Sequence, residues 1–160
     1  MESASDKCAA GTLRRATRSV ARLYDSRLAR VGLTSTQFSI LRALERHGEP
    51  VALSPLADEL VFERTSLYRA LEPLRRDGLI TIAPGSGGRA KEAALTPRGR
   101  RRIVKALPHW QEAQQAFLGQ FGRSAWNNLA ANLGDIVEAA RAIPDADEKQ
   151  RSSSLRRTAE

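Results

Sequence analysis

The stretch "LADELVFERTSLYRALEPLRRDGLI", residues 56–80, decides the fold of this chain. Apolar residues recur in it at helical spacing on both sides of a polar break, which predicts two short helices joined by a tight turn. In the second helix, Leu67, Leu71 and Leu74 fall within about 60° of one another and form the buried stripe. The opposite side is polar, and it consists of Thr65, Arg69, Glu72 and Arg76, with Ser66 and Tyr68 at its flanks.

This polar face has an ordinary explanation and a functional one. Charged residues on an outer face usually only keep a helix soluble, and Glu72 with Arg76 has the spacing of an i, i+4 ion pair. However, a short helix, a turn and a second helix that exposes Thr, Ser, Tyr and Arg have the layout of a helix-turn-helix. The second helix of that motif enters the major groove of DNA. The setting therefore favours DNA binding over a solvated surface.

The residues that follow predict a hairpin with a basic tip. Two short strands, 79–82 and 93–95, flank a Gly- and Ser-rich segment that is followed by Arg89 and Lys91. Such a loop can reach phosphates or the minor groove beside the helix-turn-helix. Together, the two parts predict a winged helix within residues 35–96.

Apolar periodicity predicts helices along most of the remaining chain. They cover residues 9–31, 35–46, 55–61, 64–77 and 97–121, with a last helix that ends before Pro144. Residues 51–53 are a short strand candidate. Ser54 and Thr96, each followed by proline, are predicted N-caps, and Ser124 is predicted to cap the last helix. The fold class is therefore mainly α with a small β-hairpin wing. The polar tail 144–160 is predicted to be disordered.

The positive charge of the chain is concentrated in one segment. The formal net charge is +8, and residues 61–105 hold eleven basic against four acidic residues, so this segment contributes +7 of it. Most of these basic residues are arginines, whose planar guanidinium suits bidentate contacts to phosphate and to guanine. An anionic partner such as nucleic acid is therefore indicated.

Other functional classes find little support in the sequence. A single cysteine, Cys8, excludes an intramolecular disulfide, and no apolar run suggests a signal peptide or membrane span, so a cytoplasmic protein is expected. His47 and His109 lack the ligand spacing of a zinc site, and His47 before Gly48 is typical of a helix C-terminus. No phosphate-binding glycine loop or catalytic constellation is visible, so we predict no enzyme activity, no metal and no cofactor.

The order of these segments resembles the MarR family of bacterial transcription regulators. The resemblance rests on "GLTSTQFSILRAL", residues 32–44, the stretch quoted above, a glycine-rich hairpin with Arg89, and "LTPRG", residues 95–99, and it covers roughly residues 10–143. It implies one domain, 1–143, in which 9–31 and 97–143 form a helical dimerisation region. It also implies a homodimer on a palindromic operator, released by a small phenolic or aromatic ligand or by thiol oxidation.

Two positions depart from the family pattern. Members commonly have an aspartate two residues before the wing arginine and another at the start of the recognition helix. Gly87 and Glu63 stand in those places here. The wing therefore lacks the acid that would anchor Arg89.

Each polar residue of the winged helix has an expected role on DNA. An exposed arginine near the start of the recognition helix can make a bidentate contact to guanine through two of its N–H groups, which is the role expected for Arg69. Thr65 and Ser66 are expected to bond phosphate or a base edge, and Tyr68 to stack on a sugar. Phosphate contacts are expected for Arg64, Arg75 and Arg76. For the wing residues Arg89 and Lys91, phosphate or minor-groove contact is expected rather than base reading in the major groove.

Two further sites follow from the resemblance and from residue chemistry. Tyr24, Phe38 and Trp110 are candidate walls of an effector cleft, with Arg18 among the arginines that attract a ligand carboxylate; the alternative is that the aromatic residues belong to the core. Cys8, beside Lys7 at a helix start, resembles the sensor cysteine of the hydroperoxide-sensing branch. The alternative is an idle, exposed thiol.

The sequence leaves two functions open that share every DNA-binding feature. One is a sequence-specific regulator, a repressor released by a ligand or by thiol oxidation. The other is a constitutive DNA-binding or chromatin-organising protein that has no effector. Only a ligand that releases DNA separates them.

Overall fold

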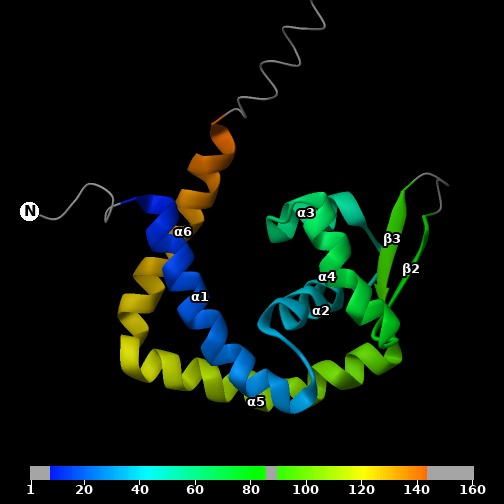
Figure 1. The fold of residues 1–160 in the computed structure, drawn as a ribbon, viewed down its shortest axis with the longest axis horizontal. Coiled ribbons are helices and arrows are strands. Elements are labelled where there is room, and N and C mark those ends of the chain that lie inside the picture. Colours follow the sequence, from blue (N-terminus) through cyan, green and yellow to red (C-terminus); the bar gives the residue numbers. More distant parts are fainter. Residues whose placement is uncertain (1–7, 86–89, 144–160) are drawn as a thin grey trace, which may run out of the picture. The chain divides into compact units, whose positions relative to one another are not determined.

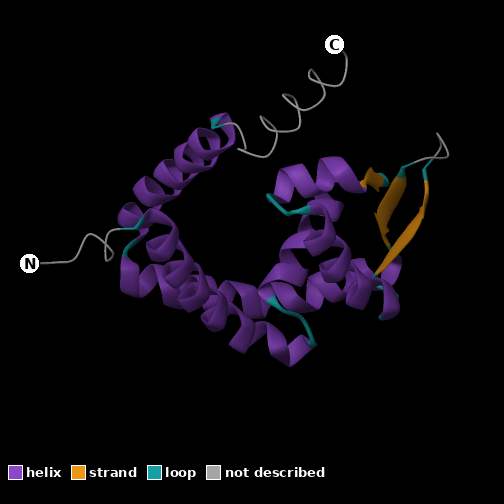
Figure 2. Ribbon diagram, turned by 45° about the horizontal axis from the view of Figure 1, so that its top comes forward, coloured by secondary structure: helices purple, strands orange, loops and turns teal. Residues whose placement is uncertain are grey.

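The computed structural model describes residues 8–85 and 90–143. Along the chain lie α1 (Ala9–Leu28), the short 3-10 helix η2 (Ala29–Val31), α2 (Ser35–His47), β1 (Val51–Ala52), α3 (Leu53–Leu60), α4 (Arg64–Arg76), β2 (Ile80–Pro84), β3 (Lys91–Leu95), α5 (Pro97–Phe121) and α6 (Arg123–Ala142). Figure 1 follows these elements in chain order, and Figure 2 shows that the described strands gather in one small sheet. The predicted fold class is confirmed. The disorder predicted for 144–160 concerns residues outside the described part.

Contacts divide the chain into two compact units, residues 1–115 and 116–160. In the first unit, β1, β3 and β2 form an antiparallel sheet in that order, and Ala93 of β3 faces both Val51 and Ile82. α3 and α4 pack on each other, and α4 also packs on β2 (Figure 1). The winged helix thus has the arrangement that the sequence predicts, and the strand candidate at 51–53 is present as the very short β1.

The core of the first unit is apolar throughout its described part. Leucines of α2, α3 and α4 pack together with apolar residues of the sheet and of α5. The fully buried large side chains are Leu28, Ile40, Leu41, Leu44, Leu56, Leu67, Leu71, Leu74, Leu79, Ile80 and Ile103. Because the three leucines of α4 belong to this cluster, the rotation of α4 about its axis is fixed by the core.

α2 has well-formed ends. The hydroxyl of Thr34 accepts a hydrogen bond from the Gln37 amide, and the Gln37 side chain accepts one from the Thr34 amide, which is a capping box. Gly48 ends the helix in the left-handed conformation at φ 73°, which glycine adopts without strain. His47 lies in the last turn, as predicted, and its Nε2 is 2.6 Å from Oε2 of Glu59 on α3.

The start of α5 is held against the end of α4. The hydroxyl of Thr96 lies 2.8 Å from the carbonyl oxygen of Gly78 and 3.0 Å from that of Leu79, and it accepts a hydrogen bond from the Gly99 amide. A Cβ on Gly99 would be 2.7 Å from Leu95 Cδ1 and closer still to the Leu79 carbonyl oxygen. The predicted Thr96 cap is therefore confirmed, and "LTPRG" is explained by this junction.

Two other predicted caps are wrong. α3 begins at Leu53 rather than Pro55, so Ser54 lies inside its first turn, because β1 ends at Ala52 and the chain turns directly into the helix. α6 begins at Arg123, and Gly122, not Ser124, is its N-cap. Gly122 has φ 96°, a conformation that glycine adopts without strain, and Ser124 is already the second residue of the helix.

The second unit holds the end of α5 and all of α6. Phe117 stacks on Phe121 with ring centroids 5.5 Å apart, and Trp126 meets Phe117 edge-on at 5.3 Å. None of the residues of α6 is buried. Within residues 8–85 and 90–143, no helix combines the length and the apolar character needed to cross a membrane.

Candidate nucleic-acid interface

The polar face of α4 is exposed, and its buried face explains why. Leu67, Leu71 and Leu74 are at most 1% exposed, which turns the other side of the helix away from the core. We call the residues on that side the reading face; they are Thr65, Ser66, Tyr68, Arg69, Glu72 and Arg76. Every one of them is exposed, which confirms the predicted orientation of this helix.

Glu63 organises the first turn of α4. Its carboxylate caps the helix by accepting a hydrogen bond from the Ser66 amide at 3.2 Å, and the Ser66 hydroxyl lies 3.4 Å from the same oxygen. Hydrogen bonds from the Thr65 amide, the Thr65 hydroxyl and Ser66 hold the pKa of Glu63 below its usual value. Glutamate thus replaces the aspartate of the family pattern as a helix cap. The two hydroxyls predicted to contact DNA are already oriented by it.

The turn before Glu63 is backbone-strained. Val61, between α3 and α4, has φ 55° and is 61% exposed, whereas β-branched residues rarely adopt this left-handed conformation. Hydrogen bonds from the Phe62 amide to Ala57 O at 2.8 Å and from the Val61 amide to Asp58 O at 3.3 Å close the turn. These bonds fix where α4 starts relative to α3.

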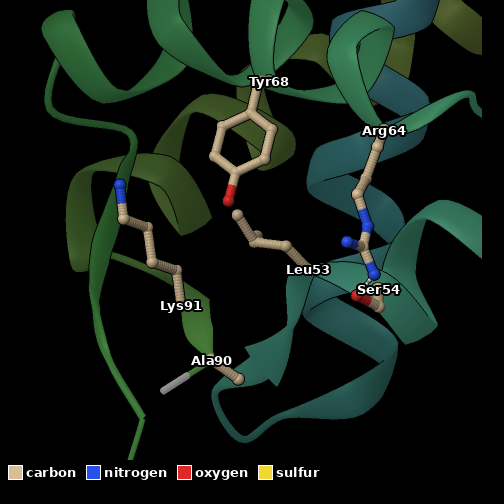
Figure 3. Close-up of a pocket in the computed structure, with 6 residues that line it drawn as sticks. All are labelled: Leu53, Ser54, Arg64, Tyr68, Ala90 and Lys91. Carbon is tan, nitrogen blue, oxygen red and sulfur yellow. Dashed lines mark hydrogen bonds between the residues drawn. The ribbon is translucent and has the colours of Figure 1, made fainter. Parts of the chain in front are cut away.

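Tyr68 and the wing meet across a hollow of about 360 Å³. Leu53, Ser54, Arg64, Tyr68, Ala90 and Lys91 line it, and Figure 3 shows the Tyr68 ring directed toward Leu53 between the two cations. Lys91 Nζ lies 5.8 Å from the centroid of the Tyr68 ring, within range of a cation–π contact. Lys91, a predicted wing residue, thereby lies beside the reading face, and its predicted contact with DNA stays a prediction.

Arg64 reaches across the same hollow to α3. Its Nη2 donates a hydrogen bond of 2.9 Å to the Ser54 hydroxyl, as Figure 3 shows. This bond ties the start of α4 to the start of α3 and holds the guanidinium at the surface. Ser54 is a residue that the sequence analysis missed as part of the site, because nothing in its local pattern announces a partner ten residues away.

The arginines of α4 differ in whether they are paired with a carboxylate. Arg75 is bound by Glu72 through two hydrogen bonds of 2.7 and 3.0 Å, and this contact holds the pKa of Glu72 below its usual value. The predicted pairing of Glu72 with Arg76 is therefore wrong; Arg76 lies 3.6 Å from Asp77 instead. Arg69 is exposed, and in the described part of the chain it has no hydrogen bond or ion pair. Arg69 is thus the cation most available to a ligand on this face.

Two of the wing residues that the sequence analysis discussed are not described by the structure. Arg89 and Gly87 lie outside the described residues, so the role predicted for Arg89 stays a prediction. Lys91 is the first residue of β3 and pairs with Pro84 of β2, and beyond this pair the Gly85 amide donates a hydrogen bond of 2.6 Å to the Ala90 carbonyl oxygen.

The predicted effector residues divide into two groups. Phe38 and Trp110, whose ring centroids are 6.2 Å apart, line a hollow of about 430 Å³, which we call the aromatic hollow; its other lining residues are Ser39, Arg42, Arg46, Leu60 and Leu107. Arg42 pairs with Glu45, and Arg46 Nη2 lies 2.7 Å from Glu59 Oε1. The sequence analysis missed both arginines, although they follow Phe38 by four and eight positions and so share its side of α2.

Tyr24 and Arg18 lie elsewhere. The Tyr24 hydroxyl donates a hydrogen bond to the Gln114 side chain, and burial raises the pKa of this hydroxyl. Arg18 is exposed on α1, where its Nε donates to the Arg14 carbonyl oxygen at 3.4 Å. Neither residue lines the aromatic hollow.

Cys8 is the N-cap residue of α1, one position before the predicted first turn. Its thiol is free and exposed, and its side chain makes no capping hydrogen bond. Among the described residues, no group of three or more His, Cys, Asp or Glu side chains is placed to hold a metal ion.

Comparisons with known proteins find a winged helix domain model and several transcriptional regulators that are similar to this chain. Residues 33–99 match the model of a winged helix DNA-binding domain. The transcriptional regulator MosR of M. tuberculosis, solved in complex with DNA, is 39% identical, with a TM-score of 0.74 over 84% of this chain and 99% of MosR. The HTH-type transcriptional regulator PecS of Dickeya dadantii is 28% identical over 129 residues, 79% of this chain and 78% of PecS. A MarR family transcriptional regulator from Rhodococcus sp. RHA1 has the same fold at 20% identity, with a TM-score of 0.73 over 85% of this chain and 96% of its own.

Proposed function

The chain belongs to the MarR family of winged helix-turn-helix transcription regulators, and we propose that it is a repressor released by a small aromatic ligand. In this proposal, two copies bind a palindromic operator, and each places α4 in one major groove. The observation that supports it most is the reading face, a row of exposed polar residues on a helix whose other side is locked into the core. MosR, the relative at 39% identity, was solved on DNA, which agrees with this use of the fold.

The chemistry of the reading face suits duplex DNA. Hydroxyls from Thr65 and Ser66 can bond phosphates or base edges, and Arg69 can take both acceptors of a guanine. Arg64 and Lys91 flank Tyr68 and present positive charge to the strands on either side. In this proposal α4 contacts the bases, and the flanking residues Arg64 and Lys91 contact the backbone phosphates.

Selection of bound fragments from genomic DNA tests this proposal directly. We expect the purified protein to enrich a palindromic sequence at moderate ionic strength and to lose affinity steeply as salt increases. A protein that retains no double-stranded DNA even at low ionic strength would contradict the proposal.

The apolar side of α6 supports the homodimer. Along this helix Trp126, Leu129, Leu133, Ile136 and Val137 recur at helical spacing, yet Leu129 is 37% exposed and Ile136 is 43% exposed. Apolar residues at this spacing on a helix with no buried residue are typical of an interface between subunits. We assign this face, with the helical region 9–31 and 97–143, to dimerisation.

Disrupting this face should separate the subunits. For the double variant Leu129→Gln with Ile136→Gln, we expect the dimer dissociation constant to rise about 100-fold or more, because both copies lose apolar burial. Sedimentation measures the change. The matched control is Ala131→Gln with Glu138→Gln, on the opposite side of α6, which should leave the dimer intact. If both doubles sediment like the parent, α6 is not the interface.

The aromatic hollow supports the ligand. Two aromatic rings form its apolar walls, and Arg42 and Arg46 also line it. These arginines can bind the carboxylate of a ligand if it displaces their partners Glu45 and Glu59. This combination fits a small aromatic acid. The hollow is formed by α2, the end of α3 and α5, so a ligand there would contact helices that support the reading face.

A titration of the operator complex tests the ligand. We expect one of a set of aromatic acids and phenols to release DNA, and Arg42→Gln to raise the concentration required by about tenfold, since a charge-assisted bond is lost. Arg15→Gln on α1 is the control and should respond like the parent. Release by peroxide that Cys8→Ser abolishes would assign regulation to the thiol, and release by none of these compounds would favour a constitutive DNA-binding protein.

A further inference from the structure

A second basic surface lies on α5, away from the reading face. Arg98, Arg101, Arg102 and Lys105 line a hollow of about 380 Å³, which we call the α5 basic hollow. Their spacings of three, one and three residues place them within about 100° on one side of the helix. Arg102 is half-buried, and the other three are exposed.

Arg102 is held in place by the chain around it. Its Nη1 donates a hydrogen bond of 2.7 Å to the carbonyl oxygen of Val31, at the end of η2. The side chain of Arg98 passes close to Gly78, where a Cβ would lie 3.9 Å from Arg98 Cδ. The hollow therefore adjoins the segment that follows α4, and Arg102, one of its lining residues, is held by a backbone hydrogen bond.

The positive charges that line this hollow repel one another. Arg98, Arg101 and Lys105 make no ion pair with any residue in the described part of the chain. Like charges three and four positions apart destabilise a helix, and the first turn of α5 contains no acidic residue to offset them. A bound anion would remove this repulsion, and phosphate suits arginine especially well.

The position of the hollow indicates which phosphate it meets. α4 is 13 residues long, so its ends are roughly 20 Å apart, and bases are read by its N-terminal half. The exposed Arg76 lies in the last turn of α4, just before Gly78, which Arg98 approaches, and the stripe on α5 extends about 10 Å further along that helix. This row of cations therefore starts at the C-terminal end of α4, the end farther from its base-reading half.

We propose that the α5 basic hollow binds the phosphate backbone of the operator's flanking DNA and lengthens the footprint beyond the base-reading contacts. The proposal rests on the DNA-binding function proposed above. It predicts an affinity that depends on duplex length without depending on the flanking sequence, because phosphates are alike at every base pair.

The test compares Arg101→Gln/Lys105→Gln with the control Arg15→Gln/Arg100→Gln, which removes the same charge from α1 and from the other side of α5. Both leave Arg102 and its bond to Val31 intact. Each protein is titrated with a selected operator duplex of core length and with the same duplex extended by about ten base pairs, one turn, on each side.

On the extended duplex, we expect the hollow variant to lose about 0.9 in salt slope for each phosphate contact removed, or about three to four units for a dimer, while the control keeps the parent slope. On the core duplex, all three proteins should bind alike. The hollow variant should melt no lower than the parent, since its repulsion is reduced.

Three outcomes would overturn the proposal. If the hollow variant and the control have equal salt slopes on the extended duplex, the hollow makes no phosphate contact. If the hollow variant loses salt slope equally on both duplexes, the phosphate contact lies inside the core footprint. If sodium tripolyphosphate raises the melting temperature of the parent but not of the hollow variant, while duplex length has no effect, the site takes a small free anion instead. A parent that binds neither duplex would refute the function itself, which is a result distinct from these.

Discussion

Replacement of Arg69 by alanine is expected to weaken operator binding by at least about 30-fold while leaving a folded dimer. A bidentate contact from arginine to guanine contributes about 1–3 kcal/mol of discrimination, and a dimer loses it in both half-sites. The fold should tolerate the change because Arg69 is exposed and, among the described residues, has no hydrogen bond or ion pair to lose. Binding isotherms on the operator and on a scrambled duplex of equal length measure both affinity and discrimination.

Arg69→Lys is the informative companion to this variant. Lysine keeps the positive charge but lacks the planar fork, so it should bind scrambled DNA like the parent and discriminate less well between the two duplexes. If Arg69→Ala loses the same affinity for both duplexes, Arg69 binds phosphate rather than a base. If it binds the operator as tightly as the parent, the reading face has been misassigned.

The orientation of α4 could be predicted from the sequence because it depends on periodicity alone. Leucines at positions 67, 71 and 74 leave only one side of a helix for the core, and the structure buries all three. The helix starts at Ser35 and Pro97 could also be predicted, because the local capping chemistry favours a helix start where the structure has one. In these segments, short-range physics and the tertiary structure favour the same conformation.

The predictions failed where several local solutions were nearly equal in energy. Glu72 can pair with a cation three or four residues later, and only the side-chain conformers decide for Arg75 over Arg76. Ser54 has the preferences of a helix cap, but β1 ends one residue before α3 begins, so the cap position falls on Ala52. Neither choice can be read from the residues nearby.

The hollow beside Tyr68 could not be predicted, because it joins segments distant in sequence. The contact of Lys91 with the Tyr68 ring requires the register of the hairpin against α4, and the bond from Arg64 to Ser54 requires the angle between two helices. Tyr24 shows the converse: its aromatic character suggested the effector cleft, but its hydroxyl is committed to Gln114. Residue type indicated the chemistry, while the position depended on packing.

The junction between α4, the sheet and α5 leads to the second large effect, which concerns stability. Gly99→Ala should lower the free energy of unfolding by about 3 kcal/mol or more and the melting temperature by about 10 °C. A methyl group there meets the Leu79 carbonyl, whose carbon would be 3.1 Å away, and Leu95 Cδ1 at 2.7 Å. Because the carbonyl is backbone, it can move only if the first turn of α5 separates from the end of α4.

Gly119→Ala, in the same helix, is the matched control for this prediction. Apart from the neighbouring residues and backbone of its own helix, no described atom lies within 4 Å of the position that its Cβ would take. Alanine favours a helix over glycine by about 1 kcal/mol, so this variant should be as stable as the parent or more so. Thermal and urea unfolding of the three proteins give the comparison. Equal melting of Gly99→Ala and the parent would mean that the junction is loose, and α5 would then no longer fix the α5 basic hollow relative to the reading face. A loss confined to Gly99→Ala would instead identify this close approach as the reason that glycine ends the "LTPRG" segment.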